Sequence, residues 1–146
     1  MNRSISHFEN CVSAMHRAIK AYRQLRNHKT RDSLSVYLTN PKPIFISDQV
    51  ADQIRKVRDA IHHLEEKVVK GDFEEGLPIA IKPFGEETSH PSQPDKIIKT
   101  IDRLKIGPHE LKFSDVAKWL NEMLNIAVKI AQYDRLTGRE CSDNAA

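Results

Sequence analysis

Residues 55–66, Arg-Lys-Val-Arg-Asp-Ala-Ile-His-His-Leu-Glu-Glu, contain the side chains with which a protein can cleave RNA without a metal ion. Arg58 can bind a phosphate through parallel N–H donors, and His63 can exchange a proton near neutral pH. Asp59 can orient either side chain. RNA supplies its own nucleophile, the 2′-hydroxyl, so a histidine that removes its proton and an arginine at the phosphate can perform the cleavage. This stretch is therefore our candidate catalytic site.

Helical spacing decides which of these residues can meet. Arg58 and His63 point about 140° apart around a helix axis, so they cannot contact each other within one helix. Arg58 and His62, which are four residues apart, share one face, and Asp59 and His63 share another. A site that uses both would need a second subunit, as in a homodimer, so that Arg58 of one chain faces His63 of the other.

The same segment also has a simpler interpretation, as the solvent-exposed face of a helix. In that case Arg55 with Asp59, and Asp59 with His63, are weak surface pairs that contribute a few tenths of a kcal/mol each, in order of magnitude about 0.3. Arg55 and His62 would support the catalytic pair only in the first interpretation.

A metal site is a further alternative. His62 and Glu66 are four residues apart, and His63 and Glu65 lie beside them. Adjacent histidines point in divergent directions, and a third ligand would have to come from elsewhere in the chain. We therefore expect no metal, and the sequence has no glycine-rich phosphate loop that would indicate a nucleotide cofactor.

The elements that must position these residues are mainly helical by their apolar periodicity. Apolar residues at intervals of three and four predict long helices over residues 6–27, 47–70 and 114–135, and a shorter helix begins at Thr30. Ser47 with Asp48 provides an N-cap signal for the helix that carries the candidate site. Gly71 is expected to end it.

The periodicity changes before the last helix. Alternation over residues 77–81 predicts a short strand, and the polar, proline-containing residues 85–95 predict a loop. A Gly107-Pro108 turn signal between two apolar stretches predicts a β-hairpin, although residues 96–104 are also compatible with a helical turn. We therefore expect one domain over residues 1–136 with a β insertion at about 77–113, followed by a flexible tail at 137–146.

Arg58-Asp59-Ala60-Ile61-His62-His63 resembles the Arg-x4-6-His signature of the HEPN superfamily. In that family the residue after the arginine is usually polar, and Asp59 fits this pattern. The resemblance implies a mainly α, up-down helical bundle that dimerises, with Arg58 binding the phosphate and His63 as the catalytic histidine. The residues after His63 depart from the pattern of the ribonuclease members, because Leu64 and Glu65 stand where a small residue and an aromatic residue are common.

Two functions follow from this resemblance. Many members are metal-independent endoribonucleases of toxin–antitoxin or phage-defence systems, which implies RNA as substrate and an antitoxin or another defence protein as partner. Other members are catalytically inactive and serve as binding, regulatory or immunity modules. The carboxylates of Glu65 and Glu66 favour the second function, because they would repel an RNA backbone.

Composition sets limits on the class of protein. Of the 146 residues, 39% are hydrophobic and 29% are charged, which is typical of a folded globular chain. The formal net charge of +3 permits contact with nucleic acid without requiring it. No apolar run approaches the roughly 18 residues of a membrane span, and the N-terminus lacks the apolar segment of a signal peptide. We expect a cytoplasmic protein without membrane contact.

Overall fold

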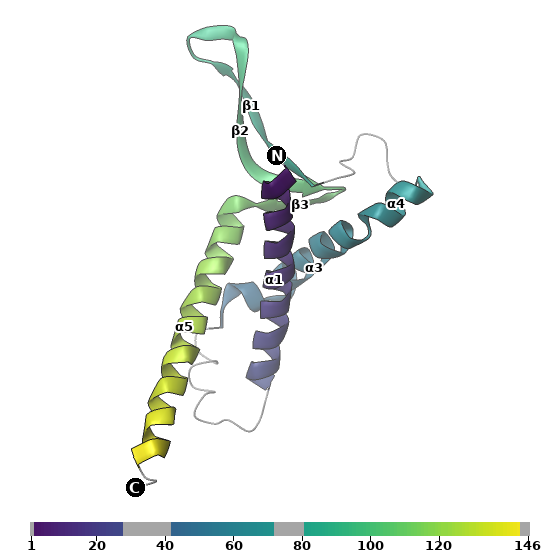
Figure 1. Cartoon of the computed structure of the whole chain (residues 1–146). Helices are drawn as coiled ribbons and strands as arrows, with labels where there is room; N and C mark the ends of the chain where they lie inside the picture. The colour runs from purple at the N-terminus through teal and green to yellow at the C-terminus, as the bar shows by residue number, and fades with distance from the viewer. Residues whose placement is uncertain (1, 28–41, 72–80, 144–146) are drawn as a thin grey trace.

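The computed structural model describes residues 2–27, 42–71 and 81–143 of the chain (Figure 1). The order of elements is α1 (Asn2–Asn27), the short 3₁₀ helix η1 (Ile44–Ile46), α3 (Asp48–His62), α4 (Leu64–Lys70), β1 (Lys82–His90), β2 (Gln93–Ile106), β3 (His109–Lys112) and α5 (Phe113–Asp143). The helix predicted from Thr30 lies outside the described residues. The predicted tail begins within α5, because this helix continues to Asp143.

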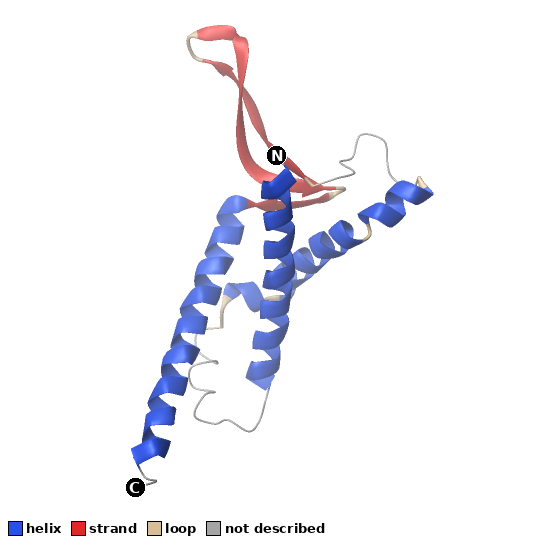
Figure 2. Ribbon diagram, viewed as in Figure 1, coloured by secondary structure: helices blue, strands red, loops and turns tan. Residues whose placement is uncertain are grey.

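The expected mainly α, up-down bundle is wrong. The three strands form an antiparallel sheet in the order β1-β2-β3, and the helices pack on it in an α+β arrangement (Figure 2). Residues 85–95, predicted as a loop, belong largely to β1 and β2. These residues are polar because most of their side chains are exposed, so they lack the apolar alternation that burial of one face produces. Cross-strand backbone hydrogen bonds form without that alternation.

The hairpin of β1 and β2 extends well beyond the helices (Figure 1). Its register runs from Lys82 opposite Lys105 to His90 opposite Gln93, with irregularities after Phe84 and after Ser89. At the first irregularity, a Cβ on Gly85 would collide with the backbone carbonyl of Thr100. Only glycine fits where the two strands approach each other so closely.

The predicted β-hairpin around Gly107-Pro108 is confirmed as β2 and β3. Leu104 pairs with Leu111, and Ile106 pairs with His109. Gly107 has a positive φ of 53°, a conformation that glycine adopts without steric cost. Because Leu104, Ile106 and Leu111 are buried, this end of the sheet is fixed against the helices.

The core lies where α1, η1, α3 and the start of α5 meet the buried end of the sheet. The largest fully buried side chains come from all of these parts except α5. From α5, Trp119 packs into the core and is 6% exposed. The buried residues are Val12, Met15, Ile19, Tyr22, Phe45, Ile46, Val50, Ile54, Val57, Ile81, Leu104, Ile106, Leu111, Val116 and Trp119.

The helix predicted over residues 47–70 is divided at His63. Its N-cap is confirmed, because the Ser47 side chain accepts a hydrogen bond from the N–H of Val50. α3 ends at His62, and His63 is its C-cap, with φ −95° and ψ 6°. α4 then begins at Leu64. Gly71 follows α4 with a positive φ of 65°, as expected of a glycine at a helix end.

Candidate functional site: a cleft lined by histidines and lysines

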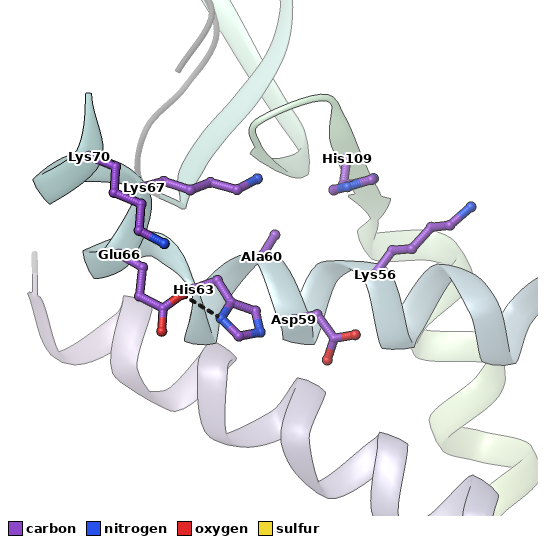
Figure 3. Close-up of a pocket in the computed structure, with 8 residues that line it drawn as sticks. All are labelled: Lys56, Asp59, Ala60, His63, Glu66, Lys67, Lys70 and His109. Atoms are coloured by element: carbon purple, nitrogen blue, oxygen red, sulfur yellow. Dashed lines mark ion pairs between the residues drawn. The ribbon is translucent and has the colours of Figure 1, made fainter. Parts of the chain in front are cut away.

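A cleft of about 350 Å³ lies between α3, α4 and the first residue of β3 (Figure 3). α3 and α4 are joined at His63, and the packing of β3 beside α3 forms the other wall. The side-chain amide of Gln53 donates a hydrogen bond to the backbone carbonyl of Glu110 at 3.0 Å and holds β3 there. The cleft is lined by Lys56, Asp59, Ala60, His63, Glu66, Lys67, Lys70 and His109.

His63 lies at the junction of the two helices that form this cleft. Its backbone N–H donates to the carbonyl of Asp59 at 2.9 Å, which fixes the end of α3. Its side-chain Nδ1 lies 3.3 Å from Oε2 of Glu66, as the dashed line in Figure 3 shows. When Nδ1 carries a proton, it donates to Glu66, and Nε2 is the ring atom that remains for a ligand. Glu66 thus has the orienting role that the sequence suggested for Asp59.

Asp59 is instead shared between two arginines of α3. Nη1 of Arg58 donates to Oδ1 of Asp59 at 3.2 Å, and Nη1 of Arg55 lies 3.6 Å from Oδ2. Arg55 also pairs with Asp52 at 2.5 Å. These ion pairs along α3 are partly exposed to solvent, so each contributes little to the stability of the fold.

Arg58 does not line the cleft that contains His63. It lies on the side of α3 that faces α1, where its charge helps to lower the pKa of His16; burial is the larger cause of that shift. The structure therefore brings Asp59 and His63 to one cleft and leaves Arg58 outside it. A site that uses both Arg58 and His63 would need the second subunit that their spacing suggested.

His62 is the last residue of α3 and is exposed, and it does not line the cleft. The side chain of Glu65 lies outside what the structure describes. Across the described parts of the chain, no group of three or more His, Cys, Asp or Glu side chains is arranged to hold a metal ion. The described helices also include none that is long and apolar enough to cross a membrane.

His109 is the lining residue that the sequence did not single out. It comes from β3, at the turn after Gly107-Pro108, and reaches the cleft only because the sheet packs beside α3. Burial lowers its pKa, and the charges of Lys56 and Lys67 lower it further, against an opposing effect of Asp52. In the sequence, His109 is distinguished only by its position directly after a turn. This position does not by itself indicate a function.

Three lysines give the cleft its positive charge. Nζ of Lys56 pairs with Oδ2 of Asp52 at 2.7 Å. For Lys67 and Lys70, no carboxylate lies within ion-pair distance among the residues whose side chains the structure describes, which do not include Glu65. Lysine ammonium groups without a carboxylate partner beside a cleft can bind anions such as phosphate.

The cleft therefore combines two imidazoles that can exchange protons with ammonium groups that can bind a phosphate. Its carboxylates are Asp59, which is engaged by arginines, and Glu66, which contacts His63. Comparisons of this chain with protein families, with characterised proteins and with solved structures found no match.

Proposed function

We propose that this chain binds RNA in the cleft and cleaves it without a metal ion, with His63 as the catalytic histidine. The observation that carries the proposal is that His63 shares one cleft with Lys67 and Lys70, whose charges have no carboxylate partner in the described residues. These groups match a phosphodiester substrate, because the lysines can neutralise its charge and the imidazole can transfer the proton that cleavage requires.

The HEPN resemblance supports the catalytic roles proposed for Arg58 and His63. The bundle fold that it also implied is not part of the proposal. Arg58 would reach the phosphate from a second subunit, because it lies outside the cleft of its own chain. An RNA-cleaving protein of this kind would act in the cytoplasm, as a toxin or in phage defence. An inhibitory partner such as an antitoxin would then bind over the cleft.

The second candidate is a catalytically inactive binding or regulatory module. One observation favours it, because Asp59 pairs with Arg58 and Arg55 within the chain and leaves little free positive charge on that face. The exposed carboxylate of Glu66 beside His63 would also repel a phosphate.

Incubation of the purified protein with labelled RNA in EDTA distinguishes the two candidates. We expect the wild type to give products that end in a 2′,3′-cyclic phosphate and a 5′-hydroxyl, and we expect His63→Asn and Arg58→Ala to lower the rate by about 100-fold or more. His7→Asn, which changes an exposed histidine of α1 outside the cleft, is the matched control.

Two results would contradict the enzymatic proposal. If the wild type binds RNA but leaves it intact, the binding module is the better description. If cleavage survives both His63→Asn and Arg58→Ala, the activity belongs to a contaminating nuclease.

A further inference from the structure

The cleft contains a second histidine, contributed by the sheet and not by the helix that carries the candidate motif. We propose that His109 is the proton acceptor of the cleft and that Lys67, together with Lys56, holds the phosphodiester beside it. This inference rests on the proposed function, because it assigns the roles of individual groups in the same cleft.

His109 is held in place by rigid neighbours. It pairs with Ile106, which is 3% exposed, and it follows the tight turn at Gly107 and Pro108. The next residue, Glu110, is tied to α3 through its backbone carbonyl and Gln53. A catalytic group on a strand that is fixed in this way keeps its position relative to a substrate better than a group on a mobile loop.

The surroundings of His109 favour its neutral form. Burial and the charges of Lys56 and Lys67 lower its pKa, and Asp52 opposes them weakly. The other charged or titratable groups of the cleft are Asp59, His63, Glu66 and Lys70. A histidine whose pKa lies below its usual value is unprotonated at neutral pH, and it can therefore accept a proton from a hydroxyl group.

The two histidines differ in their partners, and this difference assigns their roles. His63 lies 3.3 Å from the carboxylate of Glu66, which orients its imidazole. His109 has cationic lysines near it instead. His109 is therefore the group suited to accept a proton, and His63 is the other imidazole of the cleft and can donate one.

Lys67 and Lys56 are suited to hold the phosphate. In Figure 3, both extend from the helices on the side of Ala60 on which His109 lies. Lys67 has no carboxylate partner in the described residues, whereas Lys56 is shared with Asp52. The methyl group of Ala60 leaves space between them. A phosphate here would lie close to the imidazole of His109.

The chemical step balances without any further reactant. His109 removes the proton of the 2′-hydroxyl, and the 2′-oxygen forms a bond to phosphorus. The bond between phosphorus and the 5′-oxygen breaks, and this oxygen takes a proton from His63. The products are a 2′,3′-cyclic phosphate and a 5′-hydroxyl, and His109 leaves the step protonated while His63 leaves it neutral.

Phosphate binding can be measured without any catalysis. We expect inorganic phosphate, and a dinucleotide with a 2′-deoxyribose at the scissile position, to shift the proton resonances of the His109 ring in a saturable way. Lys67→Ala should weaken this binding by about tenfold, because one charge-assisted contact is lost. Lys67→Arg should restore much of it. Lys118→Ala, which changes an exposed lysine of α5 outside the cleft, should bind as the wild type does.

Kinetics test the proton transfer. Protonation of His109 should reduce the wild-type rate at acidic pH, and His109→Gln should lower kcat by about 100-fold or more and remove this acidic limb of the pH profile. Ala60→Leu should raise KM, because the larger side chain fills the cleft. Circular dichroism of each variant confirms that it is folded.

The outcomes separate this inference from the proposed function. If His63→Asn is inactive but His109→Gln keeps the wild-type rate and acidic limb, His109 is not the acceptor and the proposed function stands. If the wild type does not cleave RNA, the proposed function and the proton transfer both fail. If neither probe shifts the His109 resonances, or if Lys67→Ala binds as tightly as the wild type, the phosphate site is wrong.

Discussion

The carboxylate of Glu122 on α5 accepts a hydrogen bond from the backbone N–H of Phe45 at 3.1 Å, and its other oxygen accepts one from Ile44 at 3.3 Å. These are N–H groups at the start of η1, which the 3₁₀ helix cannot satisfy by itself. Phe45 is one of the largest fully buried side chains. A single side chain of α5 therefore fixes the segment that carries part of the core.

Glu122→Ala should lower the free energy of unfolding by about 1–2 kcal/mol, because two backbone donors lose their acceptor and one of them is partly buried. Urea denaturation followed by tryptophan fluorescence measures this change, since Trp119 is buried near the same helix surface. Asn121→Ala on the exposed side of α5 is the control. Equal stability of the two variants would show that the contact with η1 contributes nothing.

Gly85→Ala should destabilise the hairpin of β1 and β2. The new Cβ would overlap the backbone carbonyl of Thr100, so the two strands would have to separate or lose their register. We expect a loss of about 1–3 kcal/mol in urea denaturation, together with faster amide exchange in β1. Ser89→Ala near the exposed tip should change neither quantity. Unchanged exchange in Gly85→Ala would contradict the close approach of the strands.

The sequence predicted the long helices correctly but the exposed strands only in part, and the reason is physical. α1 and α5 have apolar stripes because one side of each helix is buried, and a stripe of this kind can be read from the sequence. Residues 93–101 of β2 are exposed, so burial imposes no alternation on them and they were assigned only in part. The pairing that makes them a strand is with residues of β1, and no local signal reveals it.

The candidate site shows the same difference. The motif placed Asp59 and His63 on one face of a helix, and both line the cleft. His109 was missed because its position depends on how β3 packs against α3, a contact between parts of the chain that are distant in sequence. Glu66 pairs with His63 at a spacing of three residues, which helical geometry alone would have allowed, so this partner could have been predicted from the sequence.

The stability of the protein should decrease as the pH falls below about 6.5, the usual pKa of histidine. The pKa of His16 is lowered, first by burial and then by the charge of Arg58, so the unfolded chain takes up a proton at a higher pH than the folded chain does. Stability is therefore full above the unfolded-state pKa, and it is lost as the pH decreases from that value toward the folded-state pKa. His109 acts in the same direction.

His16→Gln should make the free energy of unfolding less dependent on pH between about pH 7.5 and about pH 5. Urea denaturation at several pH values measures the slope. His7→Gln, on the same helix but exposed, provides the comparison. A slope in His16→Gln as steep as that of the wild type would mean that other groups cause the acid sensitivity.

Mixing two inactive variants tests whether the site is shared between subunits. If Arg58 acts on the cleft of a partner, Arg58→Ala and His63→Asn chains will form heterodimers in which one of the two sites is intact. Random exchange of subunits should then restore about one quarter of the wild-type cleavage rate. Sedimentation of the wild type should show a dimer in the micromolar range. A monomer, or a mixture with no activity, would rule out the shared site.

The position of His63 between α3 and α4 makes this residue a determinant of the width of the cleft. Lys56, Asp59 and Ala60 belong to α3, whereas Glu66, Lys67 and Lys70 belong to α4, so the angle between the two helices sets the distance between the two groups of side chains. The backbone of His63 forms this joint, while its side chain reaches across it to Glu66. The residue proposed to perform the chemistry is thus also the residue whose backbone sets how far apart the side chains of α3 and α4 lie.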